Sequence, residues 1–568
     1  MTAPSEPARP MAIEDRADET TPDIRPSRYP FRSLGHDQGA YFFLPADTLQ
    51  VVAIPTGSIT SKAYLLAIAP LDWWESIFPT KQGVDWTAAA NACIRWCERE
   101  GTFSGRTVRG RGAWYDQGSS VLHLGDRLIV DGERMGLIDH PSDYIYESAP
   151  ALELHSGVEP ATAREARALR DLLDAVYWKR PISAILVAGW AYLAPICGAL
   201  QWRPHVWITG QRGTGKSWIQ ENIIRPVVGT CAVIAQSNST EAGIRQTMGH
   251  DARPILFDEA EAENRRDQHR VQSVLELARQ ASSENSAEIV KGTASGRAMT
   301  FRVRSMFLLG SINVTLAQAA DVTRFTICAL DRPPSGKQGS DQFDSLRDAT
   351  RDILTPDFCA RLRARAYREI PTIRINAATI GRAVAEHLGD QRIGDQIGTL
   401  LAGAYNMKQE GVVDIDVARR MVRSMDWSEE HEQHDSASDQ DRLVNELLAK
   451  KVRVETNHGQ VDRTVAELID CGIGGQTRGI ERTDAKEALE RCGLKLDGDR
   501  SLRVANNHPW IRSALDDTPW SGGWRQILSY CGGSASCGPT KFAGQLSRAT
   551  SVPLDQIIGS IGYADDVP

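Results

Sequence analysis

The feature that most constrains the fold is a glycine-rich segment directly after a short apolar run. Residues 206–209 (VWIT) are followed by GQRGTGKS at 210–217 and then by a helical run at 218–224. The spacing G-x-x-x-x-G-K-[ST] needs a strand, a tight loop and a helix in immediate succession. The segment therefore predicts a layered α/β core in which this strand is buried.

The loop has the composition of a cradle for phosphate groups. Glycines let its backbone curl so that successive N–H groups point at one anion, at the start of a helix. Lys216 would reach the β and γ phosphates of ATP, and Ser217 would ligate Mg²⁺. We expect the whole loop to bind the nucleotide, through Gly210, Gln211, Arg212, Gly213, Thr214, Gly215, Lys216 and Ser217. The alternative is a glycine turn that binds no ligand.

An acidic pair follows the loop at a distance that suits a second strand. The apolar run 254–257 ends in Asp258 and Glu259. Asp258 would hold Mg²⁺ through its water shell, and Glu259 would act as the general base on the attacking water. The alternative is a strand that ends in acidic surface residues.

Two further strand ends carry polar side chains. The run 306–313 (MFLLGSIN) ends at Asn313, our first choice for holding the water against the γ-phosphate, with Ser311 as the alternative. Arg324 lies just before another apolar strand, where it could stabilise charge on a neighbouring subunit's γ-phosphate. Arg332 is a second candidate for this role, and an ordinary surface arginine is the alternative.

Residues 287–303 predict a β-hairpin, because two strand-like arms flank a turn bounded by glycines. Lys291 and Arg297 lie near its tip. Such cations would grip nucleic-acid phosphates without selecting a sequence. The alternative is an exposed basic turn.

Bulk properties limit the class of protein. With 568 residues, 41% of them hydrophobic, three or four domains are expected. The net charge of −8 argues against a protein that coats DNA, although a motor needs only a local basic channel. Residues 182–200 are uncharged and long enough to span a membrane, but Gly and Pro interrupt them, so we expect a buried core helix, no membrane and a cytoplasmic protein. The ten scattered cysteines are expected to be reduced thiols.

A basic, glycine-rich stretch at 106–114 could touch nucleic acid or form a plain turn.

Composition divides the chain into six parts. The predicted parts are a disordered tail at 1–30, a small α+β module at 31–150, an ATPase core at 160–335, a helical lid at 341–427, an acidic linker at 428–441 and a small C-terminal domain of winged-helix type at 442–568.

The order of the motifs described above resembles that in the superfamily 3 helicases and in the AAA+ half of phage and plasmid primase-helicases. The likeness rests on GQRGTGKS, ILFDE, the hairpin, LLGSIN and the arginine of TRF, and it covers residues 160–335. It implies a three-layer P-loop NTPase core, a hexameric ring of identical chains and work on single-stranded or forked DNA in replication of a phage or other mobile element. In that plan Asn313 takes the sensor 1 position.

Three functions remain open on sequence alone. The leading hypothesis is an ATP-dependent DNA helicase or translocase. Residues 1–160 show no zinc-binding domain or acidic triad for polymerisation, so any primase would be a separate partner. The alternatives are a non-translocating AAA+ switch ATPase (a loader, nucleic-acid sensor or defence ATPase) and a chain that binds nucleotide only to oligomerise.

Overall fold

The computed structural model describes most of the chain in two compact units. The described residues among 1–111, 123–152 and 289–302 form the first, and those among 112–122, 153–288 and 303–568 form the second. The predicted tail and acidic linker lie almost wholly outside the described residues. Those residues are 29–152, 157–236, 239–258, 265–283, 289–292, 298–312, 323–428, 439–456, 459–475, 479–498, 500–516, 518 and 520–558.

The first unit opens with an antiparallel meander and a helix. The strands β1 (Phe31–Asp37), β2 (Ala40–Pro45) and β3 (Val52–Pro55) pair in that order. Helix α3 (Trp86–Glu100) begins at Asp85, whose side chain accepts hydrogen bonds from the amides of Thr87 and Ala88. The smaller elements are α1 (Lys62–Leu66), α2 (Leu71–Ile77), β4 (Pro79–Thr80) and β5 (Gly83–Val84).

Residues 119–130 form two strands, because the chain turns at Gly125. This glycine has φ 106°, and a Cβ there would lie 2.7 Å from the carbonyl oxygen of Ala149. The strands of this region are β6 (Val108–Arg109), β7 (Gly112–Asp116), β8 (Ser119–His123), β9 (Leu128–Val130), β10 (Glu133–Met135) and β11 (Ile145–Tyr146).

Most of the basic stretch at 106–114 is buried, including Arg109, while Arg106 is exposed. The Arg109 guanidinium lies 3.3 Å from the centre of the Tyr144 ring and donates to the Tyr146 hydroxyl at 3.0 Å. Trp114 is also buried. The alternative of a structural turn between strands therefore fits better.

The second unit is built on a five-stranded sheet of parallel pairs. Its strands follow the order β13-β14-β17-β12-β18. The central strands are buried on both faces, which is why their sequences are continuous apolar runs. They are β12 (His205–Thr209), β13 (Val233–Ala235), β14 (Ile255–Phe257), β17 (Phe307–Ser311) and β18 (Phe325–Ala329).

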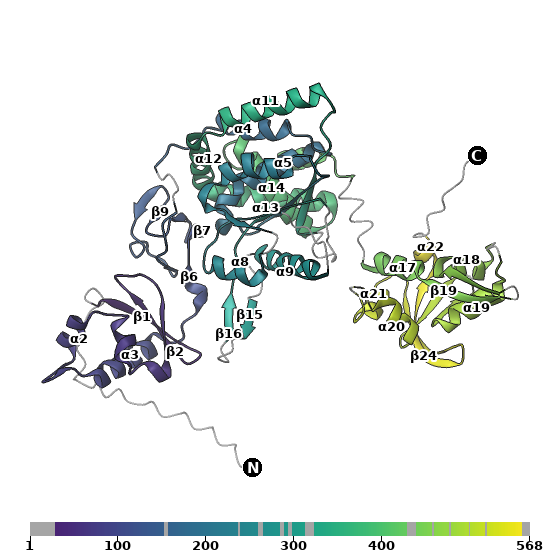
Figure 1. Cartoon of the computed structure of the whole chain (residues 1–568), viewed down its shortest axis with the longest axis horizontal. Helices are drawn as coiled ribbons and strands as arrows, with labels where there is room; N and C mark the ends of the chain where they lie inside the picture. The colour runs from purple at the N-terminus through teal and green to yellow at the C-terminus, as the bar shows by residue number, and fades with distance from the viewer. Residues whose placement is uncertain are drawn as a thin grey trace, which may run out of the picture. The chain divides into compact units, whose positions relative to one another are not determined.

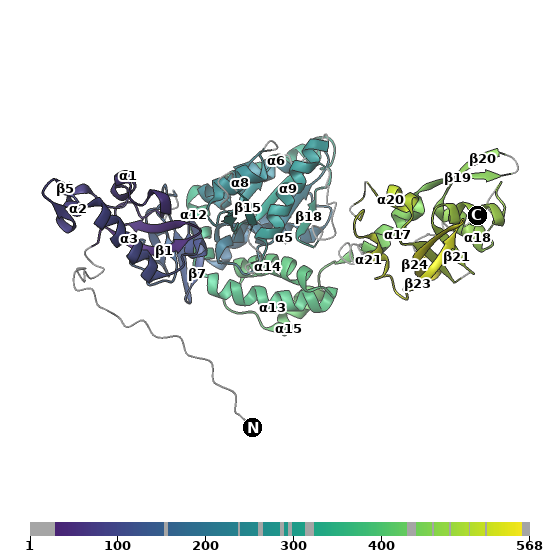
Figure 2. The same ribbon diagram turned by 90° about the horizontal axis from the view of Figure 1, so that it is seen from below.

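Helices cover both faces of this sheet, so the core has the predicted layers. Figures 1 and 2 show α8 and α9 on one face and α5, α13 and α14 on the other. Helix α4 begins at Thr162, which forms a capping box with Glu165. The longer helices before β18 are α4 (Ala163–Asp174), α5 (Pro181–Leu193), α8 (Glu241–Met248) and α9 (Arg265–Ala281).

The uncharged segment predicted as a core helix is buried. It forms α5 and a 3-10 helix that ends at Ala199, and 94% of its most apolar window is enclosed. Gly189 lets α14 approach closely, since a Cβ there would lie 2.0 Å from the carbonyl oxygen of Leu400. Its apolar character is thus accounted for by packing between the sheet and α14.

The predicted helical lid packs directly on the core as part of its helical layer. Helix α14 contacts α5, α4 and β18. Thr355 caps α12 and Pro356 takes its first turn. The helices are α11 (Lys337–Ile353), α12 (Pro356–Arg368), α13 (Ile370–Leu388), α14 (Gln391–Lys408) and α15 (Ile415–Arg423).

The C-terminal part has an apolar core of its own, which includes Leu468, Leu489 and Trp524. A four-stranded sheet of order β21-β22-β24-β23 accompanies a separate β19–β20 hairpin. The winged-helix type of this part stays a prediction. The elements are α17 (Asp439–Ala449), β19 (Lys451–Thr456), β20 (Gly459–Thr464), α18 (Val465–Ile473), α19 (Arg482–Arg491), β21 (Leu494–Asp497), β22 (Ser501–Ala505), α20 (Pro509–Leu515), α21 (Trp524–Leu528), β23 (Ala535–Phe542), β24 (Gln545–Pro553) and α22 (Leu554–Ile558).

Candidate functional site

The glycine-rich loop leaves the carboxyl end of β12, the strand between β17 and β18. Gly213 has φ 85° and Gly215 φ 94°, backbone conformations that only glycine adopts without strain. At Gly210 a Cβ would lie 2.7 Å from Thr214 Oγ1 and 3.0 Å from Leu330 Cβ. All three glycines of the motif are therefore required by the geometry of the loop.

Lys216 begins the helix that follows the loop, and its side chain folds back over the loop. Its ammonium donates to the carbonyl oxygens of Gly210 at 2.6 Å and Gln211 at 3.2 Å. The Ser217 side chain is exposed beside it. A helix start with its N–H groups directed outward, next to a held ammonium, forms a site for an anion.

Asp258 lies at the same sheet edge as the loop. Phe257 is opposite Leu309 in the β14–β17 pairing, and Ile208 is opposite Gly310 in the β12–β17 pairing. Asp258 is therefore level with the end of β12, two strands or about 10 Å away across the sheet. This separation leaves room for a metal ion and phosphate groups between the carboxylate and the loop.

Strand β17, between β12 and β14, carries Ser311, whose hydroxyl already has a hydrogen-bond partner inside the core. It is buried and accepts a hydrogen bond from Trp207 Nε1 at 2.8 Å. Asn313 and Glu259 lie outside the described residues. The chain nevertheless brings the ends of β12, β14 and β17 to one edge, where ligands bind in open parallel sheets.

Gln220 is a site residue that the sequence analysis missed. It begins a π-helical turn, η5 (Gln220–Ile224), between the short helices α6 (Lys216–Ile219) and α7 (Arg225–Val228). Such turns are rare and occur often at functional sites. Pro226 follows closely and has no N–H to continue the helical hydrogen bonds. Its position is the feature of the sequence that indicates an irregular helix here.

The Gln220 side chain lies over the middle strand, beside Asp258. It is 5% exposed, and its Nε2 has no hydrogen-bond partner among the described residues. A Cβ on Gly310 would lie 2.4 Å from Gln220 Nε2 and 3.6 Å from Asp258 Oδ1. A buried amide donor thus lies within about 6 Å of the Asp258 carboxylate, the sum of these two distances.

Arg324 lies beside the amino-terminal ends of the parallel strands, whereas the loop follows the carboxyl-terminal end of β12. It precedes β18, and Phe325 is opposite His205 at the start of β12. About 15 Å, the length of the strand, separates it from the glycine-rich loop of its own chain. Arg332, beyond the other end of β18, lies at the loop edge and is exposed.

His205 is a structural residue near Arg324. Its Nδ1 accepts from the Phe307 amide at 3.1 Å, and its Nε2 donates to the Ala278 carbonyl at 2.7 Å. Burial lowers the pKa of His205 to about 3, and the positive charges of Arg203 and Arg324 act in the same direction. The ring is therefore neutral at pH 7 and ties β12 to β17 and α9.

The predicted hairpin is present in the first unit. Strands β15 (Ile289–Gly292) and β16 (Ala298–Phe301) pair antiparallel, with Lys291 opposite Met299. Arg297 falls in the turn at 293–297, outside the described residues. The structure thus supports the hairpin, and the roles of both cations stay predictions.

The donor set at the loop edge suits a hard cation. A serine hydroxyl, an aspartate carboxylate and phosphate oxygens are the oxygen ligands that Mg²⁺ prefers. Among the described residues, no cluster of three or more His, Cys, Asp or Glu side chains could hold a metal ion by itself. All ten cysteines are free thiols.

Comparisons with known proteins give distant structural likeness only. No protein-family model and no curated protein matches the chain. A structure titled "SCCmec type IV Cch - active helicase" is similar at 13% identity and a TM-score of 0.43, covering 93% of this chain and 95% of that one. An apo structure of the NrS-1 C-terminal region is similar at 12% identity and a TM-score of 0.32, covering 92% and 96%. These values do not place the chain in a family.

Proposed function

We propose that the chain is an ATP-dependent DNA helicase or translocase, acting as a ring of identical subunits in replication of a phage or other mobile element. The observation that carries the proposal is the shared sheet edge of the glycine-rich loop and Asp258. Backbone amides, an ammonium and a carboxylate at one edge supply what binding of a metal–triphosphate complex needs.

Each group at this edge has a proposed role. Residues 210–217 hold the phosphates of ATP, with Lys216 on the β and γ groups. Ser217 and Asp258 would hold Mg²⁺, which when bound would neutralise charge on the phosphates. Glu259 orients and deprotonates the attacking water, and Asn313 holds it in line. The burial of the Ser311 hydroxyl favours Asn313 over Ser311.

Gln220 joins this set as a positioning residue. Its buried amide faces the strand that carries Gly310 and lies near Asp258. We propose that Nε2 donates to the Asp258 carboxylate or to a water that this carboxylate holds. A donor at that place would fix the direction of the Mg²⁺-binding oxygen.

Arg324 acts, in this proposal, on ATP bound by a neighbouring subunit. Its place at the sheet edge away from its own loop means that only the γ-phosphate of another copy is available to it. Turnover then depends on assembly. Lys291 and Arg297 on the hairpin grip single-stranded or forked DNA through its phosphates. We propose a cytoplasmic protein, with any primase supplied as a separate partner.

The test combines ATP turnover with assembly. ATP hydrolysis by the full chain is measured with and without single-stranded DNA, and its mass is measured in ATP. Stimulation by DNA together with a hexamer supports the proposal. No turnover, or turnover that DNA does not change in a monomer, contradicts it and favours a switch ATPase or a purely structural nucleotide.

The hairpin is tested by charge reversal. Lys291→Glu should abolish unwinding of a forked duplex while ATP still binds. Lys337→Glu, on exposed helix α11, is the matched control. Unwinding at the full rate by Lys291→Glu would remove the hairpin from the proposed mechanism.

A further inference from the structure

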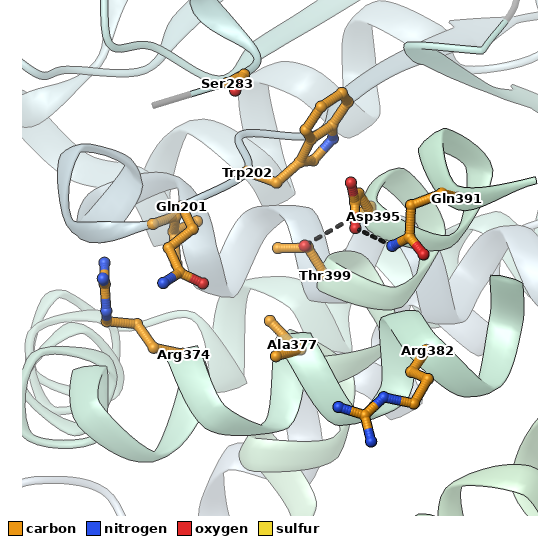
Figure 3. A pocket seen from close by; sticks show the side chains of 11 residues that line it. Gln201, Trp202, Ser283, Arg374, Ala377, Arg382, Gln391, Asp395 and Thr399 are labelled. Atoms are coloured by element: carbon orange, nitrogen blue, oxygen red, sulfur yellow. Dashed lines mark hydrogen bonds between the residues drawn. The ribbon is translucent and has the colours of Figure 1, made fainter. Parts of the chain in front are cut away.

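A cavity lies in the same unit as the five-stranded sheet, away from the glycine-rich loop. Its volume is about 560 Å³, within the range of small-molecule sites. Figure 3 shows Arg374, Ala377 and Arg382 of α13 along one side, with Gln201 and Trp202 across from them and Gln391 and Asp395 of α14 at one end.

The cavity belongs to the amino-terminal edge of the sheet. Gln201 and Trp202 directly precede β12, whereas the glycine-rich loop directly follows it. The Gln396 amide beside the cavity donates to the carbonyl oxygen of His205, the first residue of β12, at 2.7 Å. The length of β12 therefore separates the cavity from the proposed ATP site, and the two sites are distinct.

Two arginines give the floor of the cavity its positive charge. Arg374 and Arg382 are eight residues apart on α13, so they lie on one face, with an axial spacing of about 12 Å. Between them stand Ala377 and Ala378, whose short side chains leave the floor open. The Arg374 guanidinium is held by a bond to the Ala199 carbonyl and lies 4.5 Å from the Tyr115 ring centre.

Arg382 is available to an incoming anion. It is exposed, and no carboxylate of the described residues lies within ion-pair distance of it. The nearest acidic neighbour on its helix, Glu386, is already bound by Arg419 at 2.8 and 3.1 Å. The Arg382 guanidinium can therefore turn to a ligand without breaking an ion pair.

Asp395 adds an acceptor at the end of the cavity. Its Oδ1 accepts from Gln391 Nε2 at 2.8 Å, and no Lys or Arg of the described residues is paired with it. Burial raises the pKa of Asp395, and the nearby Asp390 adds to this. A half-buried carboxylate without a cation is stabilised by any ligand that donates N–H groups to it.

Trp202 provides a fixed aromatic surface. Its Nε1 donates to Gln396 Oε1 at 3.1 Å, and the Gln396 amide nitrogen donates in turn to the Thr326 hydroxyl oxygen at 3.0 Å. The orientation of the indole is thus set before any ligand arrives. Planar rings stack on such a surface, with a contribution of about 1–3 kcal/mol for a nucleic-acid base.

We propose that this cavity is a second nucleotide site, with Arg374 and Arg382 on the phosphate, Trp202 against the base and Asp395 on an amino group of the base. A simple anion would leave the Asp395 carboxylate opposed to it, and an apolar ligand would offer no partner to the charges of Arg382 and Asp395. A nucleotide carries both the anion and the N–H donors that the cavity complements. The same chemistry belongs to a free mononucleotide and to one residue of a single-stranded chain.

The direct test is binding by the full-length Lys216→Ala chain, in which the proposed ATP site is weakened. Calorimetry with dCMP measures the free nucleotide, and fluorescence anisotropy with labelled dC and dT ten-mers measures the strand. Because thymine has no amino group, dC ligands should bind several-fold more tightly than dT ligands. Binding of dCMP identifies a mononucleotide site, and binding of the ten-mer alone identifies a strand site; either outcome supports the proposal.

Two variants assign the binding to the cavity. Arg382→Gln should raise the dissociation constant at least tenfold, and Asp395→Asn should remove the preference for dC over dT. Arg392→Gln is the matched control, because Arg392 is exposed on α14 and does not line the cavity. Ala378→Trp, which fills the floor without changing charge, should also weaken binding, and melting curves verify that each variant folds.

Some outcomes would overturn the proposal. They are the absence of binding by both ligands, or affinities for Arg382→Gln and Ala378→Trp that equal that of Arg392→Gln. None of these measurements depends on ATP turnover, so they leave the proposed helicase function to its own test.

Discussion

Gly310→Ala tests the position of Gln220 with a single methyl group. The added Cβ would lie 2.4 Å from Gln220 Nε2, where ordinary contact begins at 3.4 Å, so the amide must move by about 1 Å. Asp258 Oδ1, at 3.6 Å, keeps an ordinary contact. A displacement of this size near reacting groups lowers turnover by roughly 100-fold, so we expect kcat to fall about 10- to 100-fold while ATP affinity changes little.

The assay is steady-state ATP hydrolysis over a range of Mg²⁺ concentrations, with nucleotide binding measured separately. Gln220→Ala should show the same loss, and the double variant should equal Gln220→Ala, because no amide is left to displace. Gly57→Ala, where a Cβ meets nothing within 4 Å, is the control. Full turnover by Gly310→Ala would refute the role of the Gln220 amide.

Three further predictions concern the fold that supports the site. Because the native His205 ring stays neutral while the unfolded chain takes up a proton near pH 6.5, this residue should lower the free energy of unfolding by about 2 kcal/mol from pH 7 to pH 5. In urea titrations His205→Gln should show a shallower pH dependence, and an unchanged one would contradict the assignment. Gly189→Ala forces a Cβ against the Leu400 carbonyl and should cost about 1–3 kcal/mol, seen as a lower melting temperature; an unchanged value would mean that the helices adjust freely. Arg365→Met removes the closer of two cations beside the buried Glu369, which lies 3.0 Å from Arg365 and 3.7 Å from the exposed Arg368, and should cost about 3–5 kcal/mol in urea titrations. Adding Glu369→Gln should recover part of this loss, and no recovery would contradict the importance of the pair.

The strands and helices that carry strong local patterns were predictable from sequence. The 3.6-residue period and the Asp85 cap define helix α3, and the apolar run before Gly210 defines β12. Whether such a segment forms a helix or a strand follows from the pattern of residues adjacent in the sequence. The four-stranded C-terminal sheet was not predicted, because its strands pair across helices and loops that local patterns do not connect.

The site was predictable in its loop and acidic strand but not in its full set of residues. The spacing of Gly210, Lys216 and Ser217 follows from the chemistry of a phosphate cradle, so it is visible in the sequence. Gln220 has no such pattern, because its place beside Asp258 depends on the glycine at 310 and on the π-helical turn. Packing of this kind is set by tertiary structure.

The cavity beside Trp202 could not be predicted from the sequence for a related reason. Trp202, Arg382 and Asp395 come from three separate segments, each of which has the composition of an ordinary loop or helix surface. Only the packing of α13 and α14 beside the start of β12 brings them together. The basic stretch at 106–114 shows the reverse case, since Arg109 was a plausible nucleic-acid contact until its burial was seen.

The central claim is that the loop at 210–217 holds the phosphates of ATP for hydrolysis. Its most direct test is the affinity and turnover of Mg²⁺-ATP by the wild-type chain, Lys216→Ala and the exposed-surface control Lys337→Ala. We predict that Lys216→Ala loses turnover and binds ATP at least tenfold more weakly, while the control matches the wild type. Equal affinity and turnover in all three proteins would contradict the claim.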